Sequence, residues 1–426
     1  MRVERARPVR MRRHGLRPVL VLLAAATVAG AVAVAGAATA NPPVRALTAF
    51  VRLEPARYEQ QLAETASHLK EAQALLEKGG FTVQTLRITT QPFMLYVARM
   101  TQHKALGLLS RLGQIGKEQG VLMNIGPAVL DDRPDPEALA LLEELQSHSE
   151  PLVSSMIIAA DDGIHWNTVR AAAHHVWRVA ARSPRSQGTF GFAATAMLAP
   201  GSPFYPGSWH AGQGGRFSIG LQSAGTAAEV LSRAHGDAPR AVRELTAALN
   251  AYSAQLERIA TGIESRTGWK YWGFDPTPAP LKADSIGAAI EAFGQGTFGS
   301  PGTMTAAYVI TEAVQQVSGT RVGYAGLMLP VLEDSRIAQR WSEGKIDLDS
   351  LLAYSAVCGT GLDTVPLPGD VSEEQLARIM GDVAVLAYKW KKPLTARLQP
   401  VHGRKAGDTS NFDDPFLVNA RLQPLK

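Results

Sequence analysis

The sequence contains a single cysteine, Cys358, among its 426 residues. One cysteine excludes a disulfide within the chain, so the fold must rely on its hydrophobic core. The composition supplies such a core, because 46% of the residues are apolar and 19% are charged. Zinc-site spacings are also lacking, since the nine residues from His165 to His174 turn a helix by about half a turn, and His175 follows directly. The sequence therefore indicates no metal site.

Acidic residues are nearly absent from residues 1–40, where Glu4 is the only one and seven arginines are present. Of the 43 basic and 38 acidic side chains, the rest of the chain therefore keeps 36 and 37, a net charge of −1. A nearly neutral chain beyond residue 40 has no general electrostatic attraction for a polyanion. We expect no nucleic-acid partner.

Residues 1–40 have the pattern of an export signal. An arginine-rich start precedes an apolar run from Val19 and the small residues Ala38, Thr39 and Ala40. This pattern predicts a signal peptide cleaved before Asn41 and a secreted or cell-surface protein. The alternative is an uncleaved membrane anchor over residues 19–40, because that run is just long enough to cross a bilayer.

Beyond residue 40, short β-branched segments alternate with longer amphipathic ones, which is typical of an α/β protein. Nothing between residues 46 and 400 resembles a linker, so residues 41–426 are expected to form one domain. A turn-rich stretch over residues 199–215 is the largest loop, and the longest helix begins after Asp237 and ends at Gly268. The expected strands cover residues 46–53, 81–88, 121–125, 153–159, 190–197, 217–221 and 394–399, and the other clear helices cover 96–119, 136–148 and 167–182.

Several motifs in the final third occur in the order and spacing of a known family. They comprise residues 274–291, 299–303, 329–334, 355–370 with the pattern Cys-x-x-Gly-Leu-Asp, and 392–400 followed by Gly407 and Asp408. Weaker similarity extends over residues 80–87, 154–155, 203–204 and His210. The chain thereby resembles the domain-of-unknown-function 711 family, also called uncharacterised protein family 0210, over most of its length. The export signal is a departure, since many relatives look cytoplasmic.

The resemblance implies the fold of the pyruvate formate-lyase class. This is a ten-stranded α/β barrel made of two parallel half-sheets in antiparallel arrangement. Glycyl-radical chemistry, which occurs on that barrel, does not fit the sequence, because residues 321–324 lack one residue of the radical motif and precede Cys358. The cofactor stays unknown and the family has no assigned catalytic residue, so the candidates below rest on residue chemistry.

Three residues are candidates for catalysis. Cys358 closes a helix before a glycine turn, Asp363 lies in an apolar strand, and His210 lies in the largest loop beside Trp209. They offer a nucleophile and acid–base groups. The structural alternatives are a buried apolar role for Cys358, packing of His210 on Trp209, and capping or ion pairing for Asp363.

Other residues are candidates for binding an anion. Gly299, Ser300, Gly302 and Thr303 open a helix whose free amides attract negative charge, although an ordinary capped turn has the same sequence. Arg397 lies in a strand and needs an anionic partner, which is either Asp363 or a bound carboxylate or phosphate. Lys392 and Asp275 complete the set of predicted ligand-binding residues.

These residues predict a pocket where residues 355–370, 299–303, the His210 loop and Arg397 meet. The first interpretation is a non-radical enzyme that acts on a small anionic metabolite. The second is an extracytoplasmic binding or sensing protein, and the third is a structural role at the cell surface. The sequence leaves the oligomeric state open.

Overall fold

The structure is a computed structural model that describes residues 41–148, 152–357 and 360–425. The predicted signal peptide and Cys358 lie outside these ranges. Contacts from Asn41 to Lys426 cluster as one unit. Most of its core is one large cluster of buried side chains from strands and helices along the whole of that unit, and a small second cluster surrounds Phe204 and Tyr324.

A single sheet organises this unit. Along the described chain its hydrogen-bonded path runs in the order β8 (Lys270–Asp275), β7 (Arg216–Leu221), β1 (Val44–Val51), β2 (Leu86–Thr90), β3 (Leu122–Val129), β4 (Leu152–Ala160), β6 (Phe192–Ala196), β10 (Leu394–Val401) and β9 (Gly361–Pro368), and β5 (Gly163–Ile164) pairs with β4 off that path.

The strands form two sets that run in opposite directions. β1, β2, β3, β4 and β6 are mutually parallel, and so are the pairs β7 with β8 and β10 with β9. Antiparallel pairing occurs where β1 meets β7 and where β6 meets β10. This arrangement confirms the predicted fold of two parallel half-sheets, and the predicted ten strands are reached by counting the two-residue β5.

The edge strands β8 and β9 are not paired with each other in the described part of the chain. The segment between α9 and α10 lies between them and forms one bridge to each, Phe274 with Arg321 and Pro330 with Asp363. A complete hydrogen-bonded ring, as the barrel prediction implies, is therefore not seen. The connection between the two edges is made by irregular backbone.

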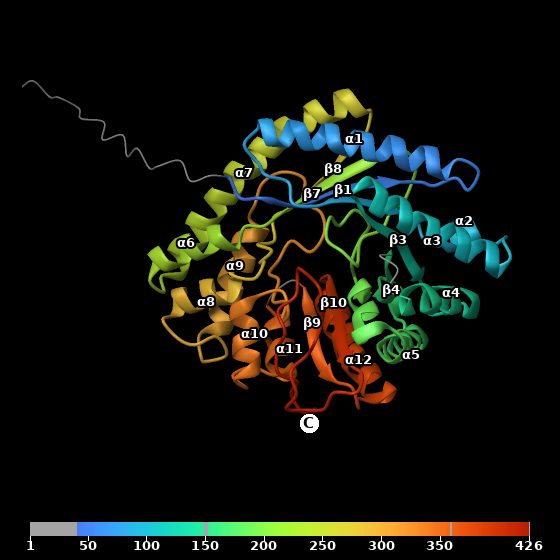
Figure 1. The fold of residues 1–426 in the computed structure, drawn as a ribbon. Coiled ribbons are helices and arrows are strands. Elements are labelled where there is room, and N and C mark those ends of the chain that lie inside the picture. The colour runs from blue at the N-terminus through green and yellow to red at the C-terminus, as the bar shows by residue number, and fades with distance from the viewer. Residues whose placement is uncertain (1–40, 149–151, 358–359, 426) are drawn as a thin grey trace, which may run out of the picture. The chain divides into compact units, whose positions relative to one another are not determined.

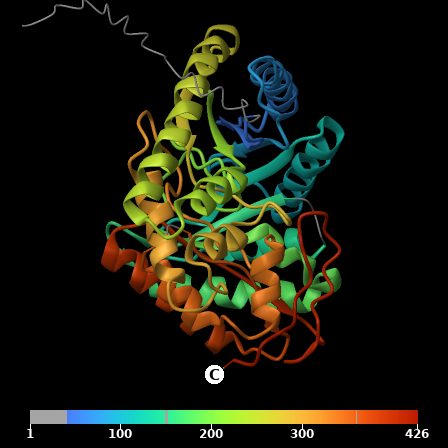
Figure 2. The same cartoon turned by 90° about the vertical axis from the view of Figure 1, so that its left-hand side faces the viewer.

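Helices lie on the outside of the sheet in both views (Figure 1 and Figure 2). They are α1 (Tyr58–Lys78), α2 (Met94–Val97), α3 (Gln102–Gln119), α4 (Pro136–Ser147), α5 (Trp166–Arg182), the 3-10 helix Pro184–Gly191, α6 (Ala224–Ala234), α7 (Ala238–Thr267), α8 (Ile286–Gly294), α9 (Thr303–Gln315), α10 (Ser335–Ser342), α11 (Leu348–Ser355) and α12 (Glu373–Trp390).

Local sequence accounts for the ends of α7. The Asp237 side chain accepts a hydrogen bond from the Arg240 amide at 3.0 Å, Pro239 lies in the first turn, and Gly268 adopts a left-handed conformation after the last turn. Leu245, Leu249 and other residues at three- and four-residue intervals are buried. The predicted boundaries of this helix are thus confirmed.

Two predicted elements differ from the observed ones. The expected strand 81–88 begins its ladder only at Leu86, because the backbone of residues 82–84 pairs with Val44 alone. The expected helix 96–119 is divided into α2 and α3, with Thr101 in extended conformation before α3. Both differences concern where backbone hydrogen bonds find partners, which hydrophobic spacing does not reveal.

The predicted loop of residues 199–215 contacts the inner side of the sheet. Thr48 Oγ1 of β1 donates to Pro203 O at 2.9 Å, and Asn124 Nδ2 of β3 donates to Pro206 O at 2.7 Å. Tyr205 OH donates to the Ile88 carbonyl of β2 at 2.7 Å. The loop therefore covers polar strand residues that would otherwise lack partners, and it delivers Tyr205 to the site described next.

Candidate functional site

Three arginines lie inside strands of the sheet and are buried. Arg45 belongs to β1, Arg87 to β2 and Arg397 to β10, and each has at most 7% of its surface exposed. With Tyr205 and Glu333 they line two adjoining cavities of about 50 and 300 Å³. We call these two cavities, joined across those five residues, the arginine chamber.

An irregularity in the β9–β10 pairing aligns Arg397 with a carboxylate. Ala396 pairs with Leu362 and Leu398 pairs with Val365, so β9 has one extra residue opposite Arg397. Thr364 takes up the distortion with a φ of 45°. Arg397 Nη1 donates to Asp363 Oδ1 at 3.0 Å. The sequence left two possible anionic partners for Arg397, Asp363 or a bound anion. The structure shows Asp363 as a partner.

Glu333 joins two of the arginines. Its Oε1 accepts from Arg397 Nη1 at 2.9 Å, and its Oε2 accepts from Arg45 Nη2 at 3.1 Å. The backbone holds Glu333 in place, because its carbonyl accepts from the Lys282 amide at 2.6 Å and the next residue, Asp334, caps α10. Two arginines and two carboxylates thus neutralise one another.

Arg87 is the arginine that this network does not neutralise. Its Nε donates to Thr85 Oγ1 at 3.0 Å, its Nη1 donates to Pro203 O at 3.5 Å, and its guanidinium lies 4.8 Å from the centre of the Tyr205 ring. No carboxylate of the described residues lies within 4.0 Å of it. Burial, with a further contribution from Arg45, lowers the pKa of Arg87 to about 10.

Two guanidinium nitrogens of the other two arginines have no hydrogen-bond acceptor within the described chain. They are Arg45 Nη1 and Arg397 Nε, and both are buried. Buried donors of this kind are uncommon and often mark a place where a ligand or water belongs. The charge of Arg87, which no carboxylate pairs, makes the arginine chamber a site that favours an anion.

Asp363 has the proton affinity of an acid–base group. Burial raises its pKa to about 6, although Arg397 opposes the shift, and Glu333 adds to it. Nearby, Tyr324 OH and Thr395 Oγ1 are 2.7 Å apart and line the smaller cavity. A carboxyl group that titrates near pH 6 exchanges protons readily at neutral pH.

Asp275 lies outside the chamber wall and positions one of its residues. Its Oδ2 accepts from the Tyr324 amide at 2.8 Å, and its Oδ1 accepts from the Ala325 amide at 3.2 Å and from Thr277 Oγ1 at 2.6 Å. Burial raises the pKa of Asp275 to about 6, and these hydrogen bonds oppose the shift. The structure therefore gives Asp275 a supporting contact with the Tyr324 segment.

His210 lies toward the other end of the strands. Its amide donates to the carbonyl of Thr90, which ends β2 three residues beyond Arg87, or about 10 Å along a strand. The ring is buried edge-on to Trp272 with 5.7 Å between centres, and neither ring nitrogen has a hydrogen-bond partner among the described residues. Burial and Arg216 lower its pKa to about 4, while the nearby Gly214 backbone opposes the shift. His210 does not line the arginine chamber.

The predicted anion-binding turn before α9 is internally capped. The Gly299 amide donates to Thr303 Oγ1 at 3.0 Å, the Thr303 amide donates to Ser300 O at 3.1 Å, and Gly302 precedes the helix with a φ of 101°. A side chain at Gly299 would meet Lys345 O at 2.3 Å, so this glycine permits contact with the chain before α11. None of these residues lines the chamber.

The predicted convergence is therefore found only in part. Asp363 and Arg397 meet in the arginine chamber, whereas the turn before α9, His210 and Lys392 do not line it. Cys358 lies outside the described residues. Sequence reasoning missed Arg45, Arg87 and Tyr205. A charged residue inside an apolar strand was the available signal for Arg87, whereas Arg45 lies one residue before the predicted strand 46–53 and inside the observed β1.

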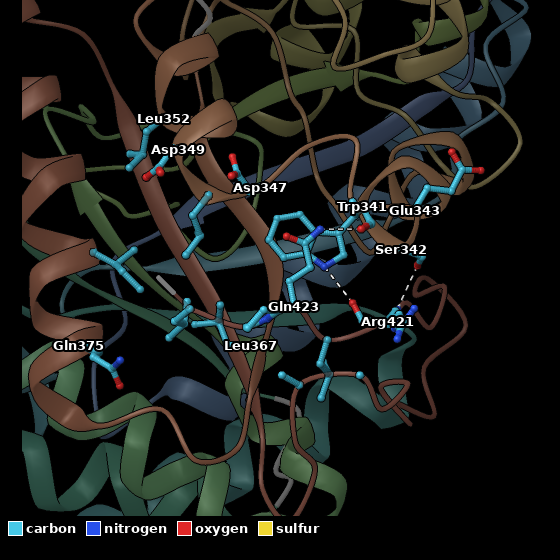
Figure 3. A pocket seen from close by; sticks show the side chains of 18 of the residues that line it. Trp341, Ser342, Glu343, Asp347, Asp349, Leu352, Leu367, Gln375, Arg421 and Gln423 are labelled. Carbon is cyan, nitrogen blue, oxygen red and sulfur yellow. Dashed lines mark hydrogen bonds between the residues drawn. The ribbon is translucent and has the colours of Figure 1, made fainter.

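A larger cavity of about 740 Å³ lies between α10, α11, α12 and the C-terminal segment (Figure 3). Trp341 Nε1 donates to Arg421 O at 3.0 Å, and Gln423 Nε2 donates to Ile346 O at 2.8 Å, so these lining residues hold the C-terminal segment in place. No buried side-chain atom lacking a partner belongs to its lining among the described residues. The arginine chamber is thus the stronger candidate, despite its smaller volume.

No group of three or more His, Cys, Asp and Glu residues suited to holding a metal ion occurs in residues 41–148, 152–357 and 360–425. The chemistry available in the chamber comes from guanidinium, carboxyl and hydroxyl groups.

Comparison with known proteins places the chain in a family. The model of the family described as Uncharacterised ACR (DUF711) matches residues 38–413. The chain belongs to the DUF711 family. The UPF0210 protein of Pyrobaculum arsenaticum is 32% identical over 395 residues, which cover 86% of each chain. The UPF0210 protein of Desulforudis audaxviator is 28% identical over 351 residues, or 78% of this chain and 77% of its own. The predicted membership of the DUF711 family is confirmed.

Among solved structures, the chain is similar to the anaerobic ribonucleotide reductase from Thermotoga maritima in complex with dATP and CTP. The match has a TM-score of 0.39 and 10% identity, and it covers 82% of this chain and 74% of that one.

The prediction of an exported protein is corrected by the comparisons. Relatives in the DUF711 family are described as UPF0210 proteins, and none of these descriptions mentions secretion or a membrane anchor. Over the described residues, no helix is both long and apolar enough to cross a bilayer. The secreted, cell-surface and extracytoplasmic interpretations are therefore not supported, and the signal-peptide interpretation of residues 1–40 falls outside the described residues.

Proposed function

We propose that the arginine chamber binds a small anion and that the protein is an enzyme that transfers a proton to or from that anion. One observation carries the proposal. Arg87 is a buried cation with no carboxylate within 4.0 Å in the described chain, while Arg45 and Arg397 are already paired. A buried charge without a partner is costly, and a bound anion removes that cost.

The neighbouring groups supply the chemistry. Asp363, ionised above pH 6, accepts a proton from the bound anion and later returns it. The extra negative charge that develops on the ligand is stabilised by the guanidinium of Arg87, which lines both cavities. Arg397 keeps Asp363 oriented through the 3.0 Å contact, and the proton passes between two atoms without an oxidant or a metal.

Binding is tested by calorimetry with inorganic phosphate, acetate, oxalate and succinate. Arg87→Met is expected to lose at least about tenfold in affinity for the anion that binds best. Its stability should change little, because the removal of an unpaired buried charge offsets the lost contacts with Thr85, Pro203 and Tyr205. Arg133→Met is the matched control, because Arg133 is 87% exposed in its side chain. An Arg87→Met protein that binds as tightly as wild type, or a wild type that binds none of these anions, contradicts the proposal.

Proton transfer is tested by proton NMR in D₂O with acetate or succinate, which have hydrogens on the carbon beside the carboxylate. The wild type should exchange hydrogens on the carbon beside the carboxylate, and Asp363→Asn should slow exchange by about 10²–10⁴-fold while retaining the anion. Thermal melting of Asp363→Asn confirms that the variant is folded. If the wild type binds the carboxylate but exchanges no hydrogen over the whole range from pH 6 to 8, the protein binds anions without catalysis and the proposed proton transfer is wrong.

A further inference from the structure

The larger cavity of the arginine chamber also contains a carboxylate without a cation. Asp414, in the C-terminal segment, lines the 300 Å³ cavity together with Arg87. Its Oδ1 accepts from the Phe416 amide at 2.8 Å, and its Oδ2 accepts from Gln187 Nε2 at 3.3 Å. Within the residues that the structure describes, no Lys, Arg or His nitrogen lies within 4.0 Å of it.

The segment that contains Asp414 is anchored to the chamber. Phe416 lies under the Arg45 guanidinium, 4.8 Å from it, and the Val418 amide donates to Leu332 O at 2.7 Å. The Asp413 amide donates to Gln187 Oε1 at 3.1 Å. These contacts hold the Asp414 carboxylate in the cavity wall.

The surroundings of Asp414 favour a cation. Burial raises its pKa and the negative charge of Glu333 adds to the shift, whereas the hydrogen bonds from Phe416 and Gln187 and the more distant positive charge of Arg397 oppose it. Its neighbour Asp413 differs, because it pairs with Arg185 at 2.8 Å and is 81% exposed in its side chain. Of these two adjacent aspartates, Asp413 is paired with a cation and Asp414 has no cation within 4.0 Å among the described residues.

The remaining charges of the chamber cancel. Arg45 and Arg397 are neutralised by Glu333 and Asp363, which leaves Arg87 and Asp414 as one positive and one negative charge on the same cavity. A ligand that complements both has one negative and one positive group. A cavity of about 300 Å³ is at the lower end of ligand-binding pockets.

We infer that the arginine chamber is selective for a small zwitterion, whose anionic group binds Arg87 and whose ammonium group binds Asp414. This inference rests on the proposed function, because it requires the anion to bind at Arg87. The anionic group is a carboxylate or a phosphate, and the test includes both.

The experiment uses pairs of compounds that differ only by an amino group. Calorimetry compares acetate with glycine, propionate with 3-aminopropionate, butyrate with 4-aminobutyrate, pentanoate with 5-aminopentanoate, and ethyl phosphate with 2-aminoethyl phosphate. At least one amino compound should bind about tenfold or more tightly than its partner. Asp414→Asn should reduce that ratio to near one without changing the affinity for the compound lacking the amino group. Asp413→Asn should leave the ratio unchanged.

Two further results keep the test decisive. If Asp414→Asn melts early, Asp414→Glu keeps the charge, moves it by one methylene, and should shift the preference to a shorter amino compound. If the simple anions bind through Arg87 and no amino compound is preferred, or if Asp414→Asn keeps the preference, the zwitterion inference is overturned and the proposed function stands. If no compound binds, the proposed function itself fails.

Discussion

Arg397 and Asp363 face each other across adjacent parallel strands, 3.0 Å apart, at the one point where β9 has an extra residue relative to β10. This β-bulge in the β9–β10 pairing therefore contributes to the arginine chamber. It brings a carboxylate from one strand and a guanidinium from the next to the same cavity.

Removing Arg397 is expected to be more harmful than removing Asp363. Arg397→Met leaves the buried Asp363 without a cation and leaves Glu333 with Arg45 alone, so we expect a loss of about 3–5 kcal/mol in the free energy of unfolding, measured with urea. Asp363→Asn should cost less, because Glu333 still pairs with Arg397. Arg378→Met is the control, with an exposed partner, and should change stability by less than about 1 kcal/mol. Equal losses for Arg397→Met and the control would contradict this account.

Asp334→Ala should destabilise the protein strongly. The buried carboxylate of Asp334 caps α10 through the Arg336 and Ile337 amides and also accepts from the start of α8, at Ser285 Oγ and the Ile286 and Gly287 amides. Losing it leaves several buried donors without an acceptor, which should cost about 3–5 kcal/mol in chemical denaturation.

Ser372→Ala is the matched control for that variant. Ser372 caps α12 at an exposed position and serves only its own helix, so we expect a loss of about 1 kcal/mol. If both substitutions have the same effect, Asp334 does not connect α8 to α10 in the way the structure indicates.

Gly361→Ala should disrupt the start of β9. Gly361 has a φ of 82°, and an added Cβ would lie 2.5 Å from Thr395 O of β10. We expect a loss of about 2–4 kcal/mol from backbone strain and the clash together. Gly403→Ala separates the two terms, because its φ is 76° and nothing lies within 4 Å. It should cost only about 1 kcal/mol, and urea unfolding of both variants measures the difference.

Asp275 should make the protein less stable as the pH rises from about 4 to about 6. The folded protein holds this proton up to a pKa of about 6, whereas the unfolded chain releases it near 3.8. The folded state therefore binds more protons in that interval, and the stability that Asp275 contributes below pH 4 is lost as the pH passes 6. Urea unfolding of wild type and Asp275→Asn at pH 4, 5, 6 and 7 gives this difference. A difference that does not change with pH would refute the assignment.

Hydrophobic spacing and capping residues were sufficient to predict α4, α5 and α7 and the class of sheet. The Asp237 cap and Gly268 define α7 through contacts within a few residues, so local sequence contains the necessary information. The DUF711 family was also recognisable from the motifs. Boundaries that depend on distant backbone partners, such as the start of β2 beside Val44, were not predictable.

The sequence by itself determined an α/β chain without a disulfide, its principal helices, its family and the need of a strand arginine, Arg397, for an anionic partner. Only the tertiary structure decided which residues meet. Arg45, Arg87, Glu333, Arg397 and Asp414 are spread over the whole chain, and strand order, an extra residue in β9 and an anchored C-terminal segment bring them to one chamber. Their charges need partners only there, because burial removes the water that would otherwise solvate each charge separately.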